Sequence, residues 1–161
     1  MQLKNQVEWA LHCCAILAGL PAGHYLGTRA LAELHGVPKE YLSKGLQALS
    51  RAGLVEGTLG PSGGYRLARA PAAISFWDVV AAVEGREPAF ACTEIRRNNP
   101  CRSKGLRDAR PCAIACVMRE AETAWRDKLS EVSLADLAVR LEQDVPPDLW
   151  QATGAWVAAR I

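Results

Sequence analysis

The chain has 161 residues, of which 50% are hydrophobic and 22% are charged, and its formal net charge is +2. This length and composition fit one globular protein with a single core or two small ones. The charge is unevenly spread, because residues 1–71 carry seven Lys and Arg against four Asp and Glu, while residues 72–161 carry twelve against thirteen. The basic excess lies in the first half, and it is too small to define a function by itself.

No stretch approaches the roughly 18 apolar residues that are needed to span a bilayer. Lys4 and the apolar residues 10–20 loosely imitate a secretion signal, but Glu8 and His12 interrupt it, so we expect a helix of the fold instead. We therefore expect a cytoplasmic protein with no membrane partner. In that compartment the six cysteines favour metal or redox chemistry over structural disulfides.

The first three predicted elements are helices. The first covers residues 3–19, and Pro21 and Gly23 end it. A second, short helix starts with Thr28 as its N-cap and ends at Gly36. The third helix begins at Pro38, whose missing N–H is not needed in a first turn, and runs to about residue 52. The buried face of the first helix is expected to carry Val7, Leu11, Cys14, Ala15 and Ala18.

The second and third helices have the spacing of a helix-turn-helix, whose second helix enters the major groove of DNA. The third helix is expected to turn Leu42, Leu46 and Leu49 towards the core. Residues 54–59, a glycine-rich turn over residues 60–64, and residues 65–69 predict a β-hairpin wing. Backbone N–H groups at such a turn can approach phosphates closely, and an arginine of the wing can lie along the minor groove.

We therefore expect contacts with double-stranded DNA from the helix-turn-helix and the wing. The alternative for each contributing residue is an ordinary exposed side chain. The expected residues are Thr28, Tyr41, Ser43, Lys44, Gln47, Arg51, Ser62, Gly63, Gly64 and Arg66.

Beyond Pro71 the pattern predicts a helix over residues 75–84, a basic loop over residues 92–112, a long helix from Cys112 and a short one over residues 133–141. The helix over residues 75–84 is expected to bury Phe76, Val79, Val80 and Val83. The long helix has a near-heptad apolar seam that suits pairing with a second copy of the chain or, nearly as well, packing on its own domain. The seam consists of Ile114, Val117, Met118, Ala121, Trp125 and Leu129.

The expected fold is mainly α. Residues 1–71 form a winged helix-turn-helix DNA-binding domain with a β-hairpin wing, and residues 72–142 form a cysteine loop and a long C-terminal dimerisation helix. Residues 143–161 form a tail that the pattern does not place, although it contains Trp150 and Trp156.

The loop cysteines are Cys92, Cys101 and Cys112, and Cys116 follows one helical turn later. Their spacing matches neither the paired knuckles of structural zinc nor a ferredoxin run. Basic neighbours favour the thiolate form, and Cys112 gains further from its place at a helix N-terminus. By contrast, Cys13 and Cys14 lie in an apolar helix and are expected to pack as small hydrophobic residues.

Glu8 and His12 are four residues apart on one face of the first helix. One interpretation is that the two side chains form a solvated pair on the helix surface. The other is that the carboxylate and the imidazole bind one metal together. Trp9 beside them supplies an apolar body large enough to cover such a site.

The sequence as a whole resembles the IscR/NsrR-type winged-helix regulators, often called the Rrf family. The resemblance covers about residues 1–142, and the helix-wing block with its Ser-Gly-Gly-Tyr tip is its most specific part. It rests on VEWALHCC, LAELHGVPKEYLSKGLQALSRAGLV, GPSGGYRLAR and FWDVVAAVEG, followed by the cysteine loop. The resemblance implies a homodimeric DNA-binding transcriptional regulator, in many members of which an iron-sulfur cluster sets the affinity for operators.

The cysteine gaps are longer than the five residues usual in that family, and the sequence is most similar to the redox-sensing RsrR branch. The resemblance to that branch implies a [2Fe-2S] cluster with two cysteines from one subunit and a glutamate and a histidine from the other. On this sequence these are Cys92 and Cys112, with Glu8 and His12 of the partner chain, while Cys101 is displaced from the pattern. Trp9 corresponds to the tryptophan implicated in the switch.

Two other sensors fit the same residues. One is a nitric-oxide or iron-availability sensor whose [4Fe-4S] cluster also uses Cys101. The other is a metal-free thiol-disulfide switch among Cys92, Cys101, Cys112 and Cys116. A third hypothesis is that the protein is a cluster scaffold or an electron carrier, and it predicts no operator binding. An enzyme is not expected, because no nucleotide-binding glycine motif, nucleophile elbow or Cys-His-Asn arrangement is present.

Overall fold

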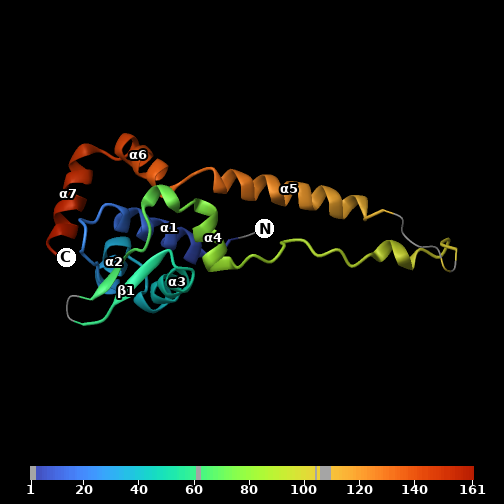
Figure 1. Ribbon diagram of the computed structural model, residues 1–161, viewed down its shortest axis with the longest axis horizontal. Helices are drawn as coiled ribbons and strands as arrows, with labels where there is room; N and C mark the ends of the chain where they lie inside the picture. The colour runs from blue at the N-terminus through green and yellow to red at the C-terminus, as the bar shows by residue number, and fades with distance from the viewer. Residues whose placement is uncertain (1–2, 61–62, 104, 106–109) are drawn as a thin grey trace.

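The computed structural model describes residues 3–60, 63–103, 105 and 110–161. Figure 1 shows a compact body from which one long arm projects. The helices are α1 (Asn5–Ala18), α2 (Thr28–His35), α3 (Lys39–Arg51), α4 (Phe76–Glu84), α5 (Ala113–Ser130), α6 (Leu134–Asp144) and α7 (Pro147–Ala158). The strands are β1 (Val55–Thr58) and β2 (Gly64–Leu67), and the short 3-10 turns are η1 (Pro71–Ala73) and η2 (Ile95–Asn98). A mainly helical fold with one antiparallel hairpin confirms the predicted winged-helix class.

The core of the body lies around α1, which contacts α3, α4, α6 and β2. Leu42, Leu46 and Leu49 of α3 are buried there, as the sequence predicted. Each buried leucine contributes about 1.5–3 kcal/mol through the apolar surface it removes from water. These contacts fix the exposed face of α3 relative to the rest of the body.

The predicted single stripe on α1 is wrong in part. Leu11, Ala15 and Ala18 are only half-buried, whereas Val7 and Cys14 are buried as expected. Three further residues of α1 are buried although the prediction did not include them: Ala10, Cys13 and Leu17. The physical reason is that α1 is a central helix with neighbours on several sides, so more than one face lies in the core.

The wing is held to the start of α2 by a short extension of its hairpin. Leu26 and Tyr65 exchange two backbone hydrogen bonds, each 3.0 Å long. Gly64 makes this approach possible, because a Cβ there would lie 2.3 Å from the carbonyl oxygen of Leu26. The extended chain continues to Gly27, which is the N-cap of α2. The expectation that Thr28 is the cap is therefore wrong by one residue, and Thr28 is the first residue of the helix.

Two capped helix starts join α4 to α6. Ser75 and Ser133 each accept a hydrogen bond from the backbone N–H three residues later, and the Asp78 and Asp136 side chains accept one back from the cap residues. The two serines also face each other in an antiparallel bridge. In α4, Val79 and Val80 are buried as predicted, while Phe76 and Val83 are only half-buried. This joint fixes the place where α5 leaves the body.

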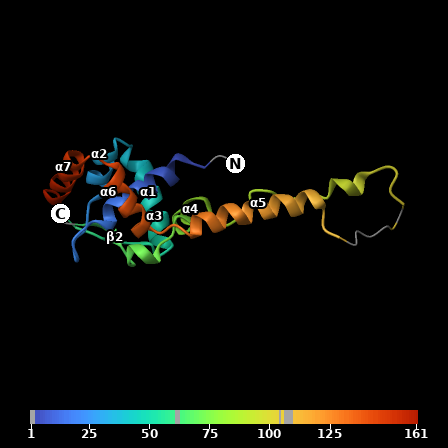
Figure 2. The same ribbon diagram turned by 90° about the horizontal axis from the view of Figure 1, so that it is seen from above.

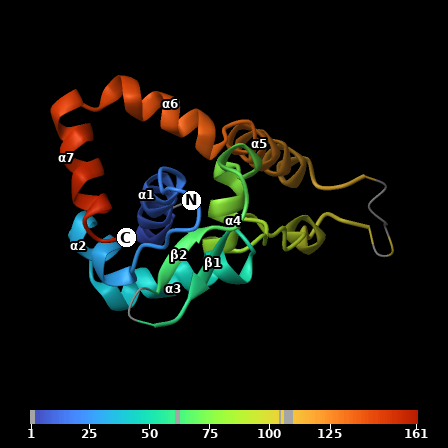
Figure 3. The same ribbon diagram turned by 60° about the vertical axis from the view of Figure 1, so that its left-hand side comes forward.

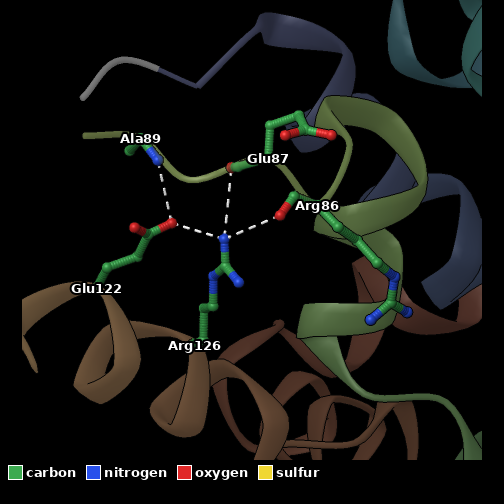
Figure 4. Close-up of polar contacts among 5 residues, drawn as sticks. All are labelled: Arg86, Glu87, Ala89, Glu122 and Arg126. Carbon is green, nitrogen blue, oxygen red and sulfur yellow. Dashed lines mark hydrogen bonds and ion pairs between the residues drawn. The ribbon is translucent and has the colours of Figure 1, made fainter. Parts of the chain in front are cut away.

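The arm consists of α5 and the chain between α4 and α5, which run antiparallel and side by side (Figures 1 and 2). Figure 4 shows how Arg126 of α5 holds this chain. Its guanidinium donates to the carbonyl oxygens of Arg86 and Glu87 at 3.1 and 3.4 Å and to the Glu122 carboxylate at 2.6 Å. That carboxylate also accepts from the backbone N–H of Ala89 at 3.1 Å.

The predicted seam of α5 divides into two halves. Near the body, Trp125 packs edge-on against Trp77 of α4, with ring centroids 5.6 Å apart, and Leu129 is half-buried. Towards the outer end, the seam residues Ile114, Val117 and Met118 are 67%, 62% and 42% exposed. The inner half therefore packs on the chain's own domain, and the outer half presents an apolar face to solvent.

The tail, which the sequence did not place, forms α7. Figure 3 shows α6 and α7 curving around α1, with the end of α7 beside α2. Arg160 fixes that end, since its guanidinium lies 3.5 Å from the Glu33 carboxylate of α2 and 3.6 Å from the ring centre of Trp156. Within the described residues, no helix is long and apolar enough to cross a membrane.

Candidate functional site

The outer face of α3 is the exposed face that the helix-turn-helix pattern predicted. Tyr41 is 55% exposed, and the Lys44 ammonium lies 5.4 Å from the centre of its ring. The hydroxyl of Ser43 is half-buried and donates to the carbonyl oxygen of Lys39 at 2.8 Å. Gln47 and Arg51 are exposed further along the same helix. These side chains are available to a duplex laid along α3.

A cleft of about 670 Å³ lies between the start of α2, α3 and the wing. Thr28 and Gly63 line it, and so do Arg29 and Lys39. Arg29 was not among the predicted DNA-contact residues, and the only signal for it was its place beside Thr28 in the first turn of α2. Two cations on the walls give the cleft the charge that a phosphate backbone requires.

The wing residues take different positions. Gly64 is buried against Leu26, and its backbone serves the hairpin pairing described above. Arg66 pairs across the strands with Glu56, and its guanidinium lies 4.8 Å from the centre of the Tyr25 ring. Ser62 lies outside the described residues.

Cys92 and Cys112 lie together at the outer part of the arm. Cys112 is the N-cap of α5, and the backbone N–H of Ala115 is the main cause that lowers the pKa of its thiol. The N–H of Ile114, a hydrogen bond from the Cys92 thiol and the charge of Arg96 lower that pKa further, against an opposing effect of desolvation. The predicted activation of Cys112 by a helix N-terminus and by basic neighbours is confirmed.

The other four cysteines are differently placed. Cys101 is exposed, and its backbone N–H donates to the side chain of Asn99 at 2.8 Å. The sulfur of Cys116 lies 3.6 Å from the Arg119 guanidinium. Cys13 and Cys14 are fully buried, and burial raises the pKa of each thiol to about 12. The expectation that this pair packs in the core is confirmed.

Glu8 and His12 are both exposed on α1, and Trp9 is half-buried against the core. Glu8 and His12 line one pocket of about 180 Å³, together with Phe76 and Leu137. The ring of His12 also lies 5.6 Å from the ring of His35, the last residue of α2.

His35 is a neighbour that the sequence pattern did not reveal. Burial, followed by the charge of His12, lowers the pKa of its imidazole. Its Nε2 has no hydrogen-bond partner within the described residues. The residue ends α2 directly before the turn to α3, so it joins the surface around His12 to the helix-turn-helix.

One chain does not bring the two halves of the expected ligand set together. Glu8 and His12 belong to the body, and Cys92 and Cys112 belong to the outer part of the arm, which points away from α1 (Figures 1 and 2). Across the described residues, no three His, Cys, Asp or Glu side chains gather closely enough to hold a metal ion. The donor types nevertheless fit an iron-sulfur cluster, since thiolates, imidazole and carboxylate are all iron ligands. Each half contains two of the four expected ligands.

The fold and the exposed α3 face define a winged-helix DNA-binding regulator. A family model described as "Rrf2: Iron-dependent Transcriptional regulator" matches residues 3–140, and the chain belongs to this family. It is thus a transcriptional regulator of a DNA-binding family. The family match ends before α7, so the helix that covers the end of α1 lies outside it.

Individual relatives agree with this assignment. The chain is 35% identical over 138 residues to YffB of Lactococcus lactis, named as an HTH-type transcriptional regulator, and this covers 86% of this chain and 87% of that protein. Its fold is similar to CymR of B. subtilis, the global cysteine regulator, with a TM-score of 0.66 and 23% identity, covering 87% of this chain and 98% of CymR. It is also similar to IscR of T. potens, with a TM-score of 0.69 and 21% identity, covering 91% and 92% of the two chains.

Proposed function

We propose that this chain is a redox-sensing transcriptional regulator that works as a homodimer and holds a [2Fe-2S] cluster across the interface of two copies. Cys92 and Cys112 of one copy supply the sulfur ligands, and Glu8 and His12 of the other complete the set. The observation that carries this proposal is that the Cys92 thiol lies near enough to Cys112 to lower its pKa, on an arm that points away from its own α1.

The arm also supports the dimer. Its outer half presents Ile114, Val117 and Met118 to solvent beside the cysteine pair, and such a patch on a regulator marks an interaction surface. A partner that packs there would shield the same region in which the cysteines lie. Pairing through this face of α5 would bury the apolar patch, and the proposal requires that it also bring the α1 of the second copy to the thiols.

The mixed ligand set suits a reversible redox centre. Two thiolates, one carboxylate and one neutral imidazole place less negative charge around iron than four thiolates do, and this raises the tendency to accept an electron, as in Rieske centres. The cluster would supply this one-electron chemistry, and the chain itself supplies the binding and the response. Arg96 and the N-terminus of α5 stabilise the thiolate of Cys112.

The response passes through α1. This helix packs on α3, and Trp9, which follows Glu8 in the chain, is half-buried against the core. His12 lies beside His35 at the end of α2, so a change at His12 would reach α2 through this contact and α3 through the packing of α1 on it. A small shift there changes the spacing of two recognition helices in a dimer, and a few kcal/mol of differential affinity is enough for a switch.

DNA contact is assigned to the exposed residues of α3, to the cleft with Arg29 and Lys39, and to the wing. The side chains of Tyr41, Lys44, Gln47 and Arg51 face outward together, which a surface for the major groove requires. Arg66, in contrast, would have to leave Glu56 and Tyr25 to reach a groove.

An anaerobic titration tests the proposal. Operator affinity should change on reduction of the purified protein while its visible absorption spectrum shows that the cluster is intact. Equal affinities of the two intact states would contradict it. The absorption and electron paramagnetic spectra of the same sample distinguish [2Fe-2S] from [4Fe-4S], and Cys101→Ala should leave a [2Fe-2S] cluster in place but remove a three-cysteine [4Fe-4S] cluster.

A metal-free thiol switch is the second candidate, and the proximity of Cys92 to Cys112 favours it too. A peroxide could oxidise the two thiols to one disulfide, with two electrons passing to the peroxide and the two thiol protons ending in the water that forms. Colourless protein after anaerobic purification, without iron or sulfide, would support this candidate over the cluster.

A further inference from the structure

The body contains a further hollow, which the proposed cluster does not use. A cavity of about 300 Å³ lies between the C-terminal half of α1, the end of α6 and α7. Ile16, Leu141 and Val157 form apolar walls, one from each helix. Figure 3 shows α6 and α7 curving around α1 at this place. Because α7 lies beyond the family match, this cavity is built partly by residues that the family assignment does not explain.

The cavity wall carries no charged side chain. Its side-chain polar groups are the Thr153 hydroxyl and the Trp150 indole N–H, and within the described residues neither side chain makes a hydrogen bond. A charged ligand would lose its hydration here without gaining a partner. The hollow is open to solvent on one side, where Trp150 is 43% exposed. An uncharged ligand with one hydroxyl or carbonyl group would pair with a wall group and bury its apolar surface against the other walls.

Gly154 lines the cavity at its open side and is itself exposed. A Cβ at this position would meet no atom within 4 Å, so a side chain placed there has room at the mouth of the cavity. A cavity about half this size, lined by apolar side chains, is sufficient to bind benzene, which makes two fused rings a suitable size for this one. Trp150 offers an aromatic side chain against which such rings can stack.

We propose that this cavity is a binding site for a small uncharged aromatic compound of about two rings with one hydrogen-bonding group. The Thr153 hydroxyl orients the polar group, and the apolar walls hold the rings. The site shares Ala15 and Leu141 with the pocket of Glu8 and His12, so an occupant bears on the same helix as the proposed cluster ligands. The binding claim does not depend on a cluster, and its failure would leave the proposed function untouched.

Calorimetric titration of the full-length protein with 2-naphthol tests the site. We expect saturable binding of 2-naphthol and none of the 2-naphthoate anion. Gly154→Leu places a side chain in the free space, favours the helix over glycine and should weaken binding by about tenfold or more. Ala155→Leu is the matched control, because this exposed residue of α7 is not part of the wall and its replacement should leave the affinity unchanged.

Two further measurements keep the test independent of that variant. Thr153→Val should weaken binding of 2-naphthol while leaving binding of naphthalene unchanged. Hydrogen exchange should slow in α7 and in the second half of α1 when 2-naphthol is bound. No binding of 2-naphthol, as when a second copy of the chain covers the cavity, would overturn the proposal, and so would equal affinities of the wild type and Gly154→Leu or equal binding of the anion.

Discussion

The body and the arm shift the pKa of cysteine thiols in opposite directions. Cys13 and Cys14 lie fully buried in the body, where desolvation raises the pKa of each thiol to about 12. Cys112 lies on the arm at the N-terminus of α5, where backbone N–H groups lower its pKa. The comparison teaches that the number of cysteines says little about their chemistry, because the environment decides whether a thiol packs or reacts.

The largest expected difference is the rate of alkylation in metal-free, reduced protein. A pKa of about 12 leaves Cys13 and Cys14 about a thousandfold less thiolate at neutral pH than an ordinary cysteine has. Because the pKa of Cys112 is lowered, its thiolate persists as the pH falls below the ordinary thiol value. Pulses of iodoacetamide followed by peptide mass spectrometry should therefore label Cys112 long before the buried pair.

The same pulses in concentrated urea provide the control, because unfolding should remove the difference between the two sites. Labelling of Cys13 in the folded protein as fast as that of Cys112 would show that the body does not protect its cysteines.

The next largest effect separates the body from the arm by stability. Leu49 is fully buried, so Leu49→Ala should lower the free energy of unfolding by about 2–5 kcal/mol through lost burial and the cavity left behind. Ile95 of the arm is 73% exposed, and Ile95→Ala should change the free energy of unfolding by no more than about 0.5 kcal/mol. Urea denaturation at one protein concentration measures both variants. Similar losses would mean that the arm is part of the core.

A smaller effect is expected from the joint that holds the arm together. Arg126→Ala removes the donor that links α5 to the carbonyl oxygens of Arg86 and Glu87, at a local cost of about 1–2 kcal/mol. Hydrogen exchange in residues 86–90 should then become faster by roughly tenfold. Lys128→Ala is the control, since its ion pair with Glu131 is largely exposed and should contribute little. Unchanged exchange in Arg126→Ala would show that this contact does not hold the chain to α5.

The smallest expected effect concerns DNA binding by the body. If Lys44 holds a phosphate, Lys44→Ala should weaken binding to all sequences and reduce the slope of log affinity against log salt by about 0.9. Lys128→Ala on the arm should leave the slope unchanged. Loss of discrimination at a single base position would instead make Lys44 a base reader and contradict the phosphate assignment.

The winged helix could be predicted from the sequence because its signals are local. The spacing of Leu42, Leu46 and Leu49 identifies a helix with one buried face, and the glycine-rich turn marks a hairpin. The reactive position of Cys112 also follows from a local feature, the start of a helix. Such features need only neighbouring residues to be recognised.

Features that join distant parts of the chain could not be predicted in this way. The small-residue pattern of α7 does not show which neighbour it meets, and its place depends on contacts of Val157 with the core and of Arg160 with Glu33. His35 approaches His12 only because α2 packs beside α1. The tail and the neighbour of the proposed ligand therefore had to come from the structure.

Mixed dimers test the central claim, that the cysteine pair of one copy is completed by α1 of the other. One chain carries Cys92→Ser and Cys112→Ser, its partner carries Glu8→Ala and His12→Ala, and the purified heterodimer is reconstituted with iron and sulfide. A site shared between copies predicts one complete ligand set and about half of the wild-type cluster absorption. No cluster in the heterodimer, as in either variant homodimer, would contradict it.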